Sequence, residues 1–313
     1  MDWALALGAL VVGICVGLTG MGGGALMTPM LVIFFGVSPL AAVSSDLVAS
    51  AVMRPVGAFV HLRHGNARLD LVRWLCLGSV PAAFCGVLIA RALGSGDGVQ
   101  NVIQKALGVA LIVAASGLLV RAYLRLAERA AQRDGHRAKD PKGPPQIVVK
   151  PLPTVLVGLI GGLVVGLTSV GSGSLIIIAL MTLYPTLRAS ELVGTDLVQA
   201  VPLVLSAAIG QLIFGQFEFS VTAALLVGSI PGAYIGAQLS SRLPSALIRR
   251  ALGFVLLASA LKMLGVGNVM TLVVLAAIVV VSGPVWMLLR RSHGFPALPS
   301  REAPLPEHAE AVG

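Results

Sequence analysis

Charged side chains are scarce in this chain of 313 residues, since Asp, Glu, Lys and Arg together make up 11% of it. A soluble fold carries about 25% charged residues, so a water-facing surface of the usual kind is excluded. Hydrophobic residues make up 57% of the chain, and apolar runs long enough to cross a bilayer recur along it. Because lipid offers the backbone no hydrogen bonds, such runs must be helical. The sequence predicts an all-α polytopic membrane protein.

Cysteine is also scarce, and the basic residues are not gathered into a patch. Cys15, Cys76 and Cys85 lie within apolar runs without CxxC spacing, which favours packing roles over a disulfide, metal or redox site. The net charge of +9 comes mainly from Lys and Arg in one connector and at the ends of apolar runs. This distribution is typical of membrane topology signals and not of nucleic-acid binding. His61 and His64 stand three residues apart, as metal ligands can, but they lack a third ligand, which favours interfacial polar anchors over a metal site. We also expect no cofactor and no nucleic-acid partner.

An internal repeat organises the chain. Residues 13–26, GICVGLTGMGGGAL, match residues 162–175, GLVVGLTSVGSGSL, at an offset of 149. Further along, Asp46 corresponds to Asp196 at an offset of 150. We therefore expect two copies of one unit. The expected parts are a first repeat at 1–123, a basic connector at 124–150 whose first part continues the preceding helix, a second repeat at 151–266, an extra C-terminal helix at 267–291, and a disordered tail at 292–313.

The first apolar run indicates that the two copies are inverted. As one helix, residues 3–35 would be about 50 Å long, whereas the bilayer core is about 30 Å thick. Because a Gly-rich cluster interrupts the run, a re-entrant hairpin fits better. One hairpin and about three crossings per copy make an odd number of crossings, so the second copy must be inverted. The basic residues then share one side, which predicts a cytoplasmic connector and C-terminus and an outside N-terminus.

Inverted repeats with Gly-broken segments in matching positions are typical of secondary transporters. Unpaired backbone groups at such breaks, and the N-terminus of the restarting helix, suit an anionic ligand. The alternative is that the glycines merely let crossing helices pack closely. The candidate substrate-binding residues are Thr19, Gly20, Gly22, Gly23, Gly24, Thr168, Ser169, Gly171, Ser172, Gly173, Ser174 and Arg54.

Three charged residues fall well inside the expected spans: Asp46, Asp196 and Arg54. Ionisable groups at that depth by default mark a transport pathway or an interior pair. We expect the two aspartates either to carry protons or to cap backbone amides, and Arg54 either to pair with an anion or with an acidic group. Because Val204 takes the place of Arg54 in the second repeat, Asp196 is expected to exchange a proton more readily than Asp46.

Several of these segments resemble a known family. GLTGMGGGAL at 17–26, SSDL at 44–47, GTDL at 194–197 and a GxxPGAxxG stretch from 228 to 236 are similar to the TauE/SafE sulfite exporter family, over about residues 5–265. The resemblance implies proton-motive-force-dependent movement of small sulfur-containing anions, sulfite or organosulfonates, across the bacterial inner membrane. The alternatives are a passive anion channel of the same architecture and an intramembrane enzyme or assembly factor. No nucleophile–base pair accompanies the spans, so no catalytic residue is predicted.

Overall fold

Every regular element in the described part of the chain is helical, and no strand occurs there. The computed structural model describes residues 3–19, 23–63, 67–94, 96–133, 148–185, 187, 189–215, 218–240 and 245–292. The elements are α1 (Trp3–Thr19), α2 (Gly24–Phe35), α3 (Pro39–Arg63), α4 (Leu69–Leu93), α5 (Asp97–Arg133), α6 (Pro151–Thr168), a π-helical turn η1 (Ser172–Ile176), α7 (Ile177–Leu183), α8 (Ala189–Phe214), α9 (Phe219–Ser240), α10 (Ser245–Met263) and α11 (Asn268–Ser292).

Six of these helices are long and apolar enough to cross a membrane: α4, α5, α6, α8, α9 and α11. Large apolar side chains stand exposed on them, such as Leu77 on α4 and Ile213 on α8. A soluble protein does not expose apolar surface on this scale, whereas lipid would cover it. The all-helical, multi-pass fold expected from the sequence is confirmed at this level.

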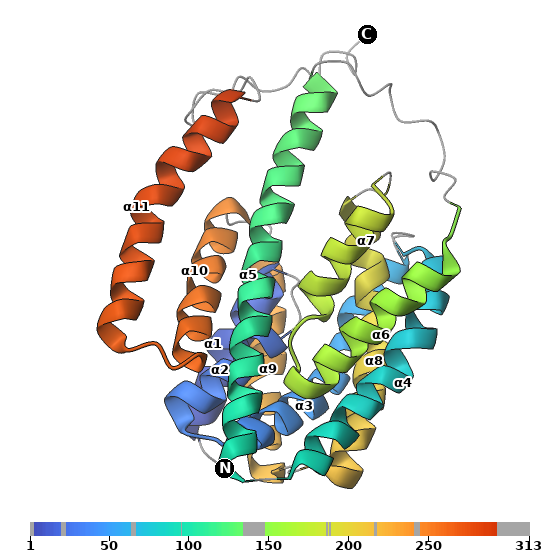
Figure 1. Cartoon of the computed structure of the whole chain (residues 1–313), viewed down its shortest axis with the longest axis vertical. Helices are drawn as coiled ribbons and strands as arrows, with labels where there is room; N and C mark the ends of the chain where they lie inside the picture. The colour runs from blue at the N-terminus through green and yellow to red at the C-terminus, as the bar shows by residue number, and fades with distance from the viewer. Residues whose placement is uncertain are drawn as a thin grey trace.

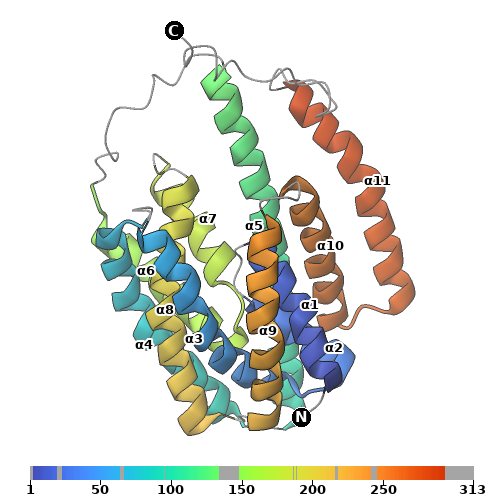
Figure 2. The same ribbon diagram turned by 180° about the vertical axis from the view of Figure 1, so that it is seen from behind.

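Both Gly-interrupted apolar runs turn back on themselves. The first run forms a hairpin of α1 and α2, whose open end lies at the lower end of the molecule in Figure 1. The second run forms a hairpin of α6, η1 and α7, whose open end lies at the upper end (Figures 1 and 2). The two hairpins therefore enter the bundle from opposite ends, and their tips meet in its interior.

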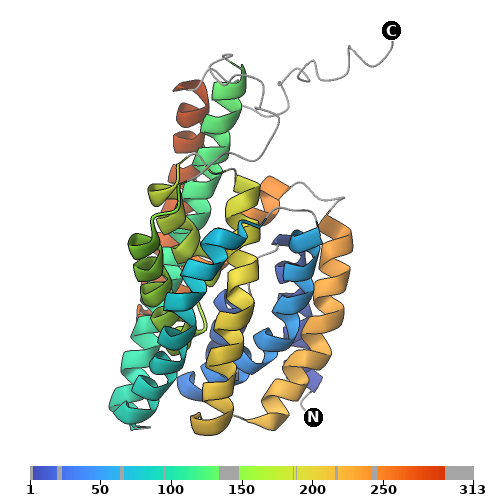
Figure 3. The ribbon, with the colours of Figure 1, turned by 90° about the vertical axis from the view of Figure 1, so that its right-hand side faces the viewer.

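The two halves of the chain pack crosswise. Seen from the side, α4, α8, α3 and α9 lie next to one another in that order (Figure 3). Helix α6 packs against α4 and α1 packs against α9, so each hairpin rests on a helix from the other half. Helix α5 packs against α10. The core thus lies between the halves and holds both hairpin tips.

Glycines permit the closest of these crossings. A Cβ atom on Gly13 would lie 2.6 Å from the carbonyl oxygen of Ser229, and one on Gly162 would lie 2.3 Å from that of Ser79. The two contacts join matching positions, because Gly13 corresponds to Gly162 at an offset of 149 and Ser79 to Ser229 at an offset of 150. A side chain at Gly13 would push α1 away from α9, and one at Gly162 would push α6 away from α4.

The two ends of the bundle differ in charge. Helices α3, α5, α9 and α11 end at the upper end in Figure 1, where α4, α6, α8 and α10 begin. The lower end carries few basic residues, among them Arg91 and Lys262. The arginines of the upper end are more numerous and include Arg63, Arg68, Arg73, Arg125, Arg129, Arg133, Arg249, Arg250 and Arg291.

Helix α11 contributes little to the core. Helix α11 stands at the edge of the molecule against α10 (Figure 2), and only 6% of its apolar segment is buried. Helix α5 runs on to Arg133, so the first part of the expected connector is helical. The rest of the connector (134–147), the expected tail from residue 293 onward, and Gly20 and Gly22 lie outside the described residues.

Candidate functional site

Asp46 lies at the centre of the molecule and accepts hydrogen bonds from both hairpins. It stands on α3 and is 1% exposed. Thr28 on α2 and Ser169 at the end of α6 each donate a hydroxyl hydrogen bond to its Oδ2 atom, at 2.8 and 2.7 Å. Ser50, one turn along α3, donates to Oδ1 at 3.4 Å. One carboxylate therefore links the first hairpin to the second.

The interruption of the second hairpin is held in an unusual backbone conformation. Ser169 caps α6 with φ at 57°, the one positive value at a non-glycine position among the described residues. The left-handed region is unfavourable for a residue with a Cβ atom. Its amide donates to the carbonyl of Val165 at 2.7 Å, which ends the helix, while its hydroxyl reaches Asp46. The strain is therefore held at the point where the two halves of the chain meet.

The first hairpin touches the second at the same point. A Cβ atom on Gly24, the first residue of α2, would lie 2.1 Å from the carbonyl oxygen of Ser169. Gly23, which precedes α2, is buried, and no side chain caps the helix there. For Gly24, close packing of crossing segments thus accounts for the absence of a side chain. Of the expected first break, Thr19 ends α1, whereas Gly20 and Gly22 are not described.

The second break is shorter than the sequence suggested. Residues 169–171 are non-helical, and Gly171 takes a φ of 125°. Ser172, Gly173 and Ser174 were expected in the break but belong to η1, whose Leu175 amide donates to the Gly171 carbonyl at 3.0 Å. This part of the prediction was wrong because a π-helical turn accommodates glycine and serine without leaving the helix. Thr168 uses its hydroxyl locally, donating to the carbonyl of Val164 at 2.7 Å.

Arg54 interacts with both buried aspartates across the α3–α8 crossing. Arg54 and Asp196 are 8% and 2% exposed. The stronger of the favourable charge interactions of Arg54 is with Asp196 on α8, and the weaker is with Asp46 on its own helix. We expected Asp196 to be protonated more readily because Arg54 was assumed to interact with Asp46 alone. That assumption was wrong. Because α3 and α8 run antiparallel, a residue two turns beyond Asp46 approaches the partner aspartate.

The two buried glutamines of α8 bridge helices. Gln199 donates from Nε2 to the Ser79 hydroxyl on α4 at 3.0 Å. Gln211 accepts from the Ser44 hydroxyl on α3 at 2.8 Å. Each amide thus joins α8 to a helix of the first half of the chain. Among the described residues, no cluster of His, Cys, Asp and Glu could hold a metal ion.

Thr28 and Ser50 were not singled out in the sequence, although both donate to Asp46. A signal existed for Ser50, because a residue four positions after Asp46 lies on the same side of the helix. Thr28 has no such relation, since only the turn of the hairpin brings α2 to α3. Together with Ser169, they surround the Asp46 carboxylate with hydroxyl donors. The same carboxylate also interacts electrostatically with the buried guanidinium of Arg54.

This arrangement could link the binding of a proton by Asp46 to the binding of an anion beside it. An ionised carboxylate only accepts hydrogen bonds, so Thr28, Ser50 and Ser169 can all donate to it. A protonated carboxyl must itself donate, which releases at least one hydroxyl, and it no longer attracts Arg54. The donors and the guanidinium would then be available to an anion in the same place.

Known proteins resemble this chain over most of its length. The family model described as sulfite exporter TauE/SafE matches residues 5–263. The chain is 36% identical to the probable membrane transporter protein YjnA of Bacillus subtilis (strain 168), over 84% of this chain and 100% of that protein. It is 24% identical to the probable membrane transporter protein YdhB of the same organism, over 77% of this chain and 91% of the relative.

A further relative comes from another bacterium. A probable membrane transporter protein of Xylella fastidiosa (strain Temecula1 / ATCC 700964) is 28% identical over 80% of this chain and 90% of its own length. No solved structure matches significantly. The family match covers both hairpins and every helix up to the end of α10, which includes all residues around Asp46. The chain therefore belongs to the TauE/SafE sulfite exporter family of membrane transporters.

Proposed function

We propose that this protein is a secondary transporter of small sulfur-containing anions, sulfite or organosulfonates, coupled to the proton motive force. The observation that carries the proposal is the bonding of Asp46 to both hairpins, through Thr28 and Ser169. A change in the charge of this one group alters contacts in both halves of the chain. Proton binding can thereby be linked to a rearrangement of the whole molecule.

The two halves are proposed to be inverted repeats, each with one re-entrant hairpin. The crosswise packing supports this, because α1 on α9 and α6 on α4 are equivalent contacts in such a pair. The hairpins entering from opposite ends support it as well (Figure 1). In a bilayer each hairpin tip then lies near the midplane, where inverted repeats of transporters bind their substrates.

The anion is proposed to bind between the hairpin tips, close to Asp46. Arg54 supplies a buried positive charge there, and Ser169 supplies a hydroxyl donor. The remaining expected ligands are backbone groups of the two interruptions, around residues 19–24 and 169–171. Asp46 and Asp196 have distinct parts in the coupling: Asp46 competes with the anion for the hydroxyl donors, and Asp196 competes with it for Arg54.

The protein is proposed to lie in the bacterial inner membrane with the arginine-rich end in the cytoplasm. Basic residues near membrane spans are retained on the cytoplasmic side. This orientation places the 124–150 connector and the C-terminus inside and the N-terminus outside. The first hairpin is then reached from outside and the second from the cytoplasm.

Flux into liposomes tests the function. The purified protein, reconstituted into liposomes, is offered sulfite, sulfoacetate, sulfate or acetate with and without an imposed pH gradient. We expect saturable flux of sulfite or sulfoacetate that responds to the gradient and loses this response with a protonophore. Flux that neither saturates nor responds to the gradient would identify a passive channel. An absence of flux for both sulfur anions together with flux of acetate would refute the substrate class.

A further inference from the structure

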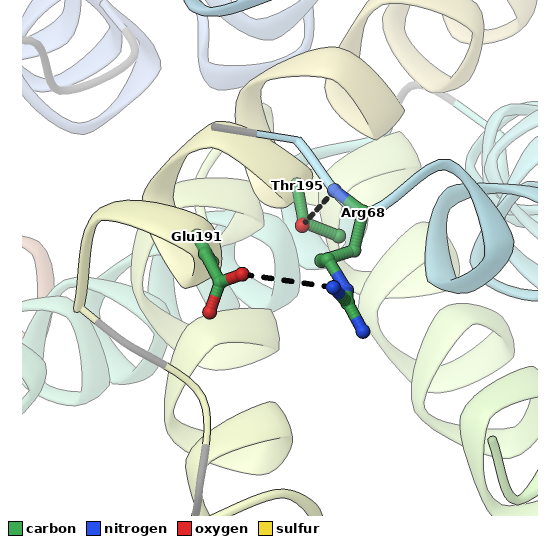
Figure 4. Close-up of polar contacts among 3 residues, drawn as sticks. All are labelled: Arg68, Glu191 and Thr195. Carbon is green, nitrogen blue, oxygen red and sulfur yellow. Dashed lines mark hydrogen bonds and ion pairs between the residues drawn. The ribbon is translucent and has the colours of Figure 1, made fainter. Parts of the chain in front are cut away.

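A second polar contact lies near the arginine-rich end, away from Asp46. Arg68, the residue before α4, donates its backbone N–H to the hydroxyl oxygen of Thr195 on α8 at 3.0 Å. Its guanidinium Nη1 lies 3.8 Å from Oε1 of Glu191, in the first turn of α8. Figure 4 shows both interactions reaching from the segment before α4 to one face of α8. The start of α4 is thus tied to the beginning of α8.

This contact lies between the arginine-rich end and the buried Asp196. Glu191 and Thr195 occupy successive turns at the start of α8, and Asp196 follows directly. Thr195 is fully buried, whereas the side chains of Arg68 and Glu191 are 22% and 10% exposed. The tie therefore spans from partly exposed charges to the buried interior.

The opposite end of the molecule lacks the equivalent contact. At an offset of 150, Glu218 takes the place of Arg68, Ala41 that of Glu191, and Ser45 that of Thr195. Glu218 and Ala41 offer no ion pair. The Ser45 hydroxyl is buried and has no hydrogen-bond partner within the described ranges. The two ends correspond to each other in the repeat, but among the described residues this contact is present only at the arginine-rich end.

We propose that the contact of Arg68 with Glu191 and Thr195 is a releasable latch, which closes the route to Asp196 from the arginine-rich end. The proposal rests on the proposed transport function, for which the latch is one gate. A single hydrogen bond and a partly exposed ion pair suit this task, because both are weak enough to break and re-form in each cycle. Opening the latch separates Arg68, at the start of α4, from α8 and admits water to Asp196.

Cys76 is a native reporter beneath the latch. It lies on α4, and its Sγ atom is 4.0 Å from the carbonyl oxygen of Gln199 on α8. Cys76 follows the start of α4 by seven residues, and Asp196 follows the start of α8 by the same number. Since both helices begin at the same end, the two residues lie at similar depth. The thiol therefore becomes accessible from the arginine-rich end when the latch opens.

The test measures the rate at which Cys76 reacts with a membrane-impermeant maleimide, applied at the arginine-rich end of a protein in which Cys15 and Cys85 are replaced by alanine. Replacing Thr195 by valine keeps the shape and removes the acceptor. Glu191→Gln removes the ion pair. We expect each to raise the rate about two- to tenfold, the effect of losing one ordinary interaction that holds the closed state.

Matched variants distinguish opening of the latch from a general loss of helix packing. Thr195→Ser keeps the hydroxyl and should react at the parental rate, as should Ser45→Ala, which removes the hydroxyl without a partner at the equivalent position. The exchange Arg68→Glu with Glu191→Arg restores the ion pair and should return the rate toward the parental value. Parental rates in both Thr195→Val and Glu191→Gln would overturn the latch. Because the labelling rate requires no flux, these outcomes are independent of whether sulfite or sulfoacetate is transported.

Discussion

At the scale of single residues, Asp46 is distinguished by the hydroxyl groups that surround it. Two hydroxyls from different halves of the chain donate to the same oxygen atom, and a third donates to the other. Asparagine satisfies this geometry, since its amide oxygen accepts from Thr28 and Ser169 while its NH2 group donates to the Ser50 oxygen. The substitution therefore removes the exchangeable proton and the negative charge that attracts Arg54, and it keeps the hydrogen bonds.

We accordingly expect Asp46→Asn to fold and to bind sulfite or sulfoacetate, but to lose the response of flux to a pH gradient. Anion binding is measured by thermal stabilisation of the purified protein, and coupling by flux in liposomes with and without a protonophore. Asp70→Asn, at an exposed carboxylate in the first turn of α4, is the control and should behave as the parent. A wild-type response in Asp46→Asn would exclude Asp46 as the proton carrier.

Ser169 allows its hydrogen bond and its backbone strain to be separated. Replacement by alanine loses the bond to Asp46 and keeps the cost of a φ of 57°. Replacement by glycine loses the same bond but removes that cost. The free energy of unfolding of Ser169→Gly should therefore be about 1 kcal/mol higher than that of Ser169→Ala. Chemical unfolding in detergent micelles measures the difference, and equal stabilities would show that the strain is not stored at this residue.

Sequence reasoning singled out the charged residues because their chemistry conflicts with lipid. Asp46, Asp196 and Arg54 stand out because each places a charge within an apolar run. Thr28 and Ser50 have no such signal, because a hydroxyl is tolerated at many positions of a membrane helix. The pairing of Arg54 with Asp196 was missed for another reason: it depends on how α3 crosses α8, and a sequence offset carries no information on a crossing.

At the scale of elements, helix-to-helix distance is set by glycines that meet a partner backbone. Gly162→Ala places a Cβ atom 2.3 Å from the Ser79 carbonyl oxygen, and Gly13→Ala places one 2.6 Å from that of Ser229. Each should destabilise the protein by about 1–3 kcal/mol, because α6 must move from α4, or α1 from α9. Gly253→Ala on α10 is the control, since nothing lies within 4 Å of its added Cβ atom.

That control should be neutral or stabilising by up to about 1 kcal/mol, because alanine favours a helix more than glycine does. Unfolding of the three variants in detergent gives the comparison. If Gly162→Ala and Gly253→Ala proved equally stable, the close crossing of α6 and α4 would not determine the stability of this protein.

The elements themselves could largely be predicted, because long apolar runs in lipid have to be helices and a Gly cluster interrupts them. The extent of the second interruption could not. Ser172, Gly173 and Ser174 have the composition of a loop, yet they form a π-helical turn that keeps most backbone groups bonded. Composition indicates where a helix is weak, whereas the packing around it decides whether the helix opens.

At the scale of the whole molecule, α11 is separable from the rest. The family match ends at residue 263, before α11 begins at Asn268, and α11 packs chiefly on α10. A protein that stops after Gly267 should therefore fold and retain its flux of sulfite or sulfoacetate. A protein that stops after Ser292 serves as the control. Loss of flux in the first truncation alone would show that α11 takes part in the transport unit.

The proposed inversion of the two halves concerns the whole molecule and can be tested at four exposed positions. Ser38 follows the first hairpin and Gly96 precedes α5, and both lie at the lower end in Figure 1. Pro185 follows the second hairpin and Val148 precedes α6, and both lie at the upper end. In inverted repeats, the positions after the two hairpins face opposite sides of the membrane, whereas in parallel repeats they face the same side.

Single cysteines at these positions, in a protein without Cys15, Cys76 and Cys85, are labelled with an impermeant maleimide in intact cells. Because basic residues near membrane spans are generally retained on the cytoplasmic side, we expect labelling of Ser38→Cys and Gly96→Cys from outside. We expect labelling of Val148→Cys and Pro185→Cys only after the cells are opened. If Ser38→Cys and Pro185→Cys were both labelled in intact cells while Val148→Cys was not, the repeats would be parallel. The two hairpins could then not approach Asp46 from opposite sides of the membrane.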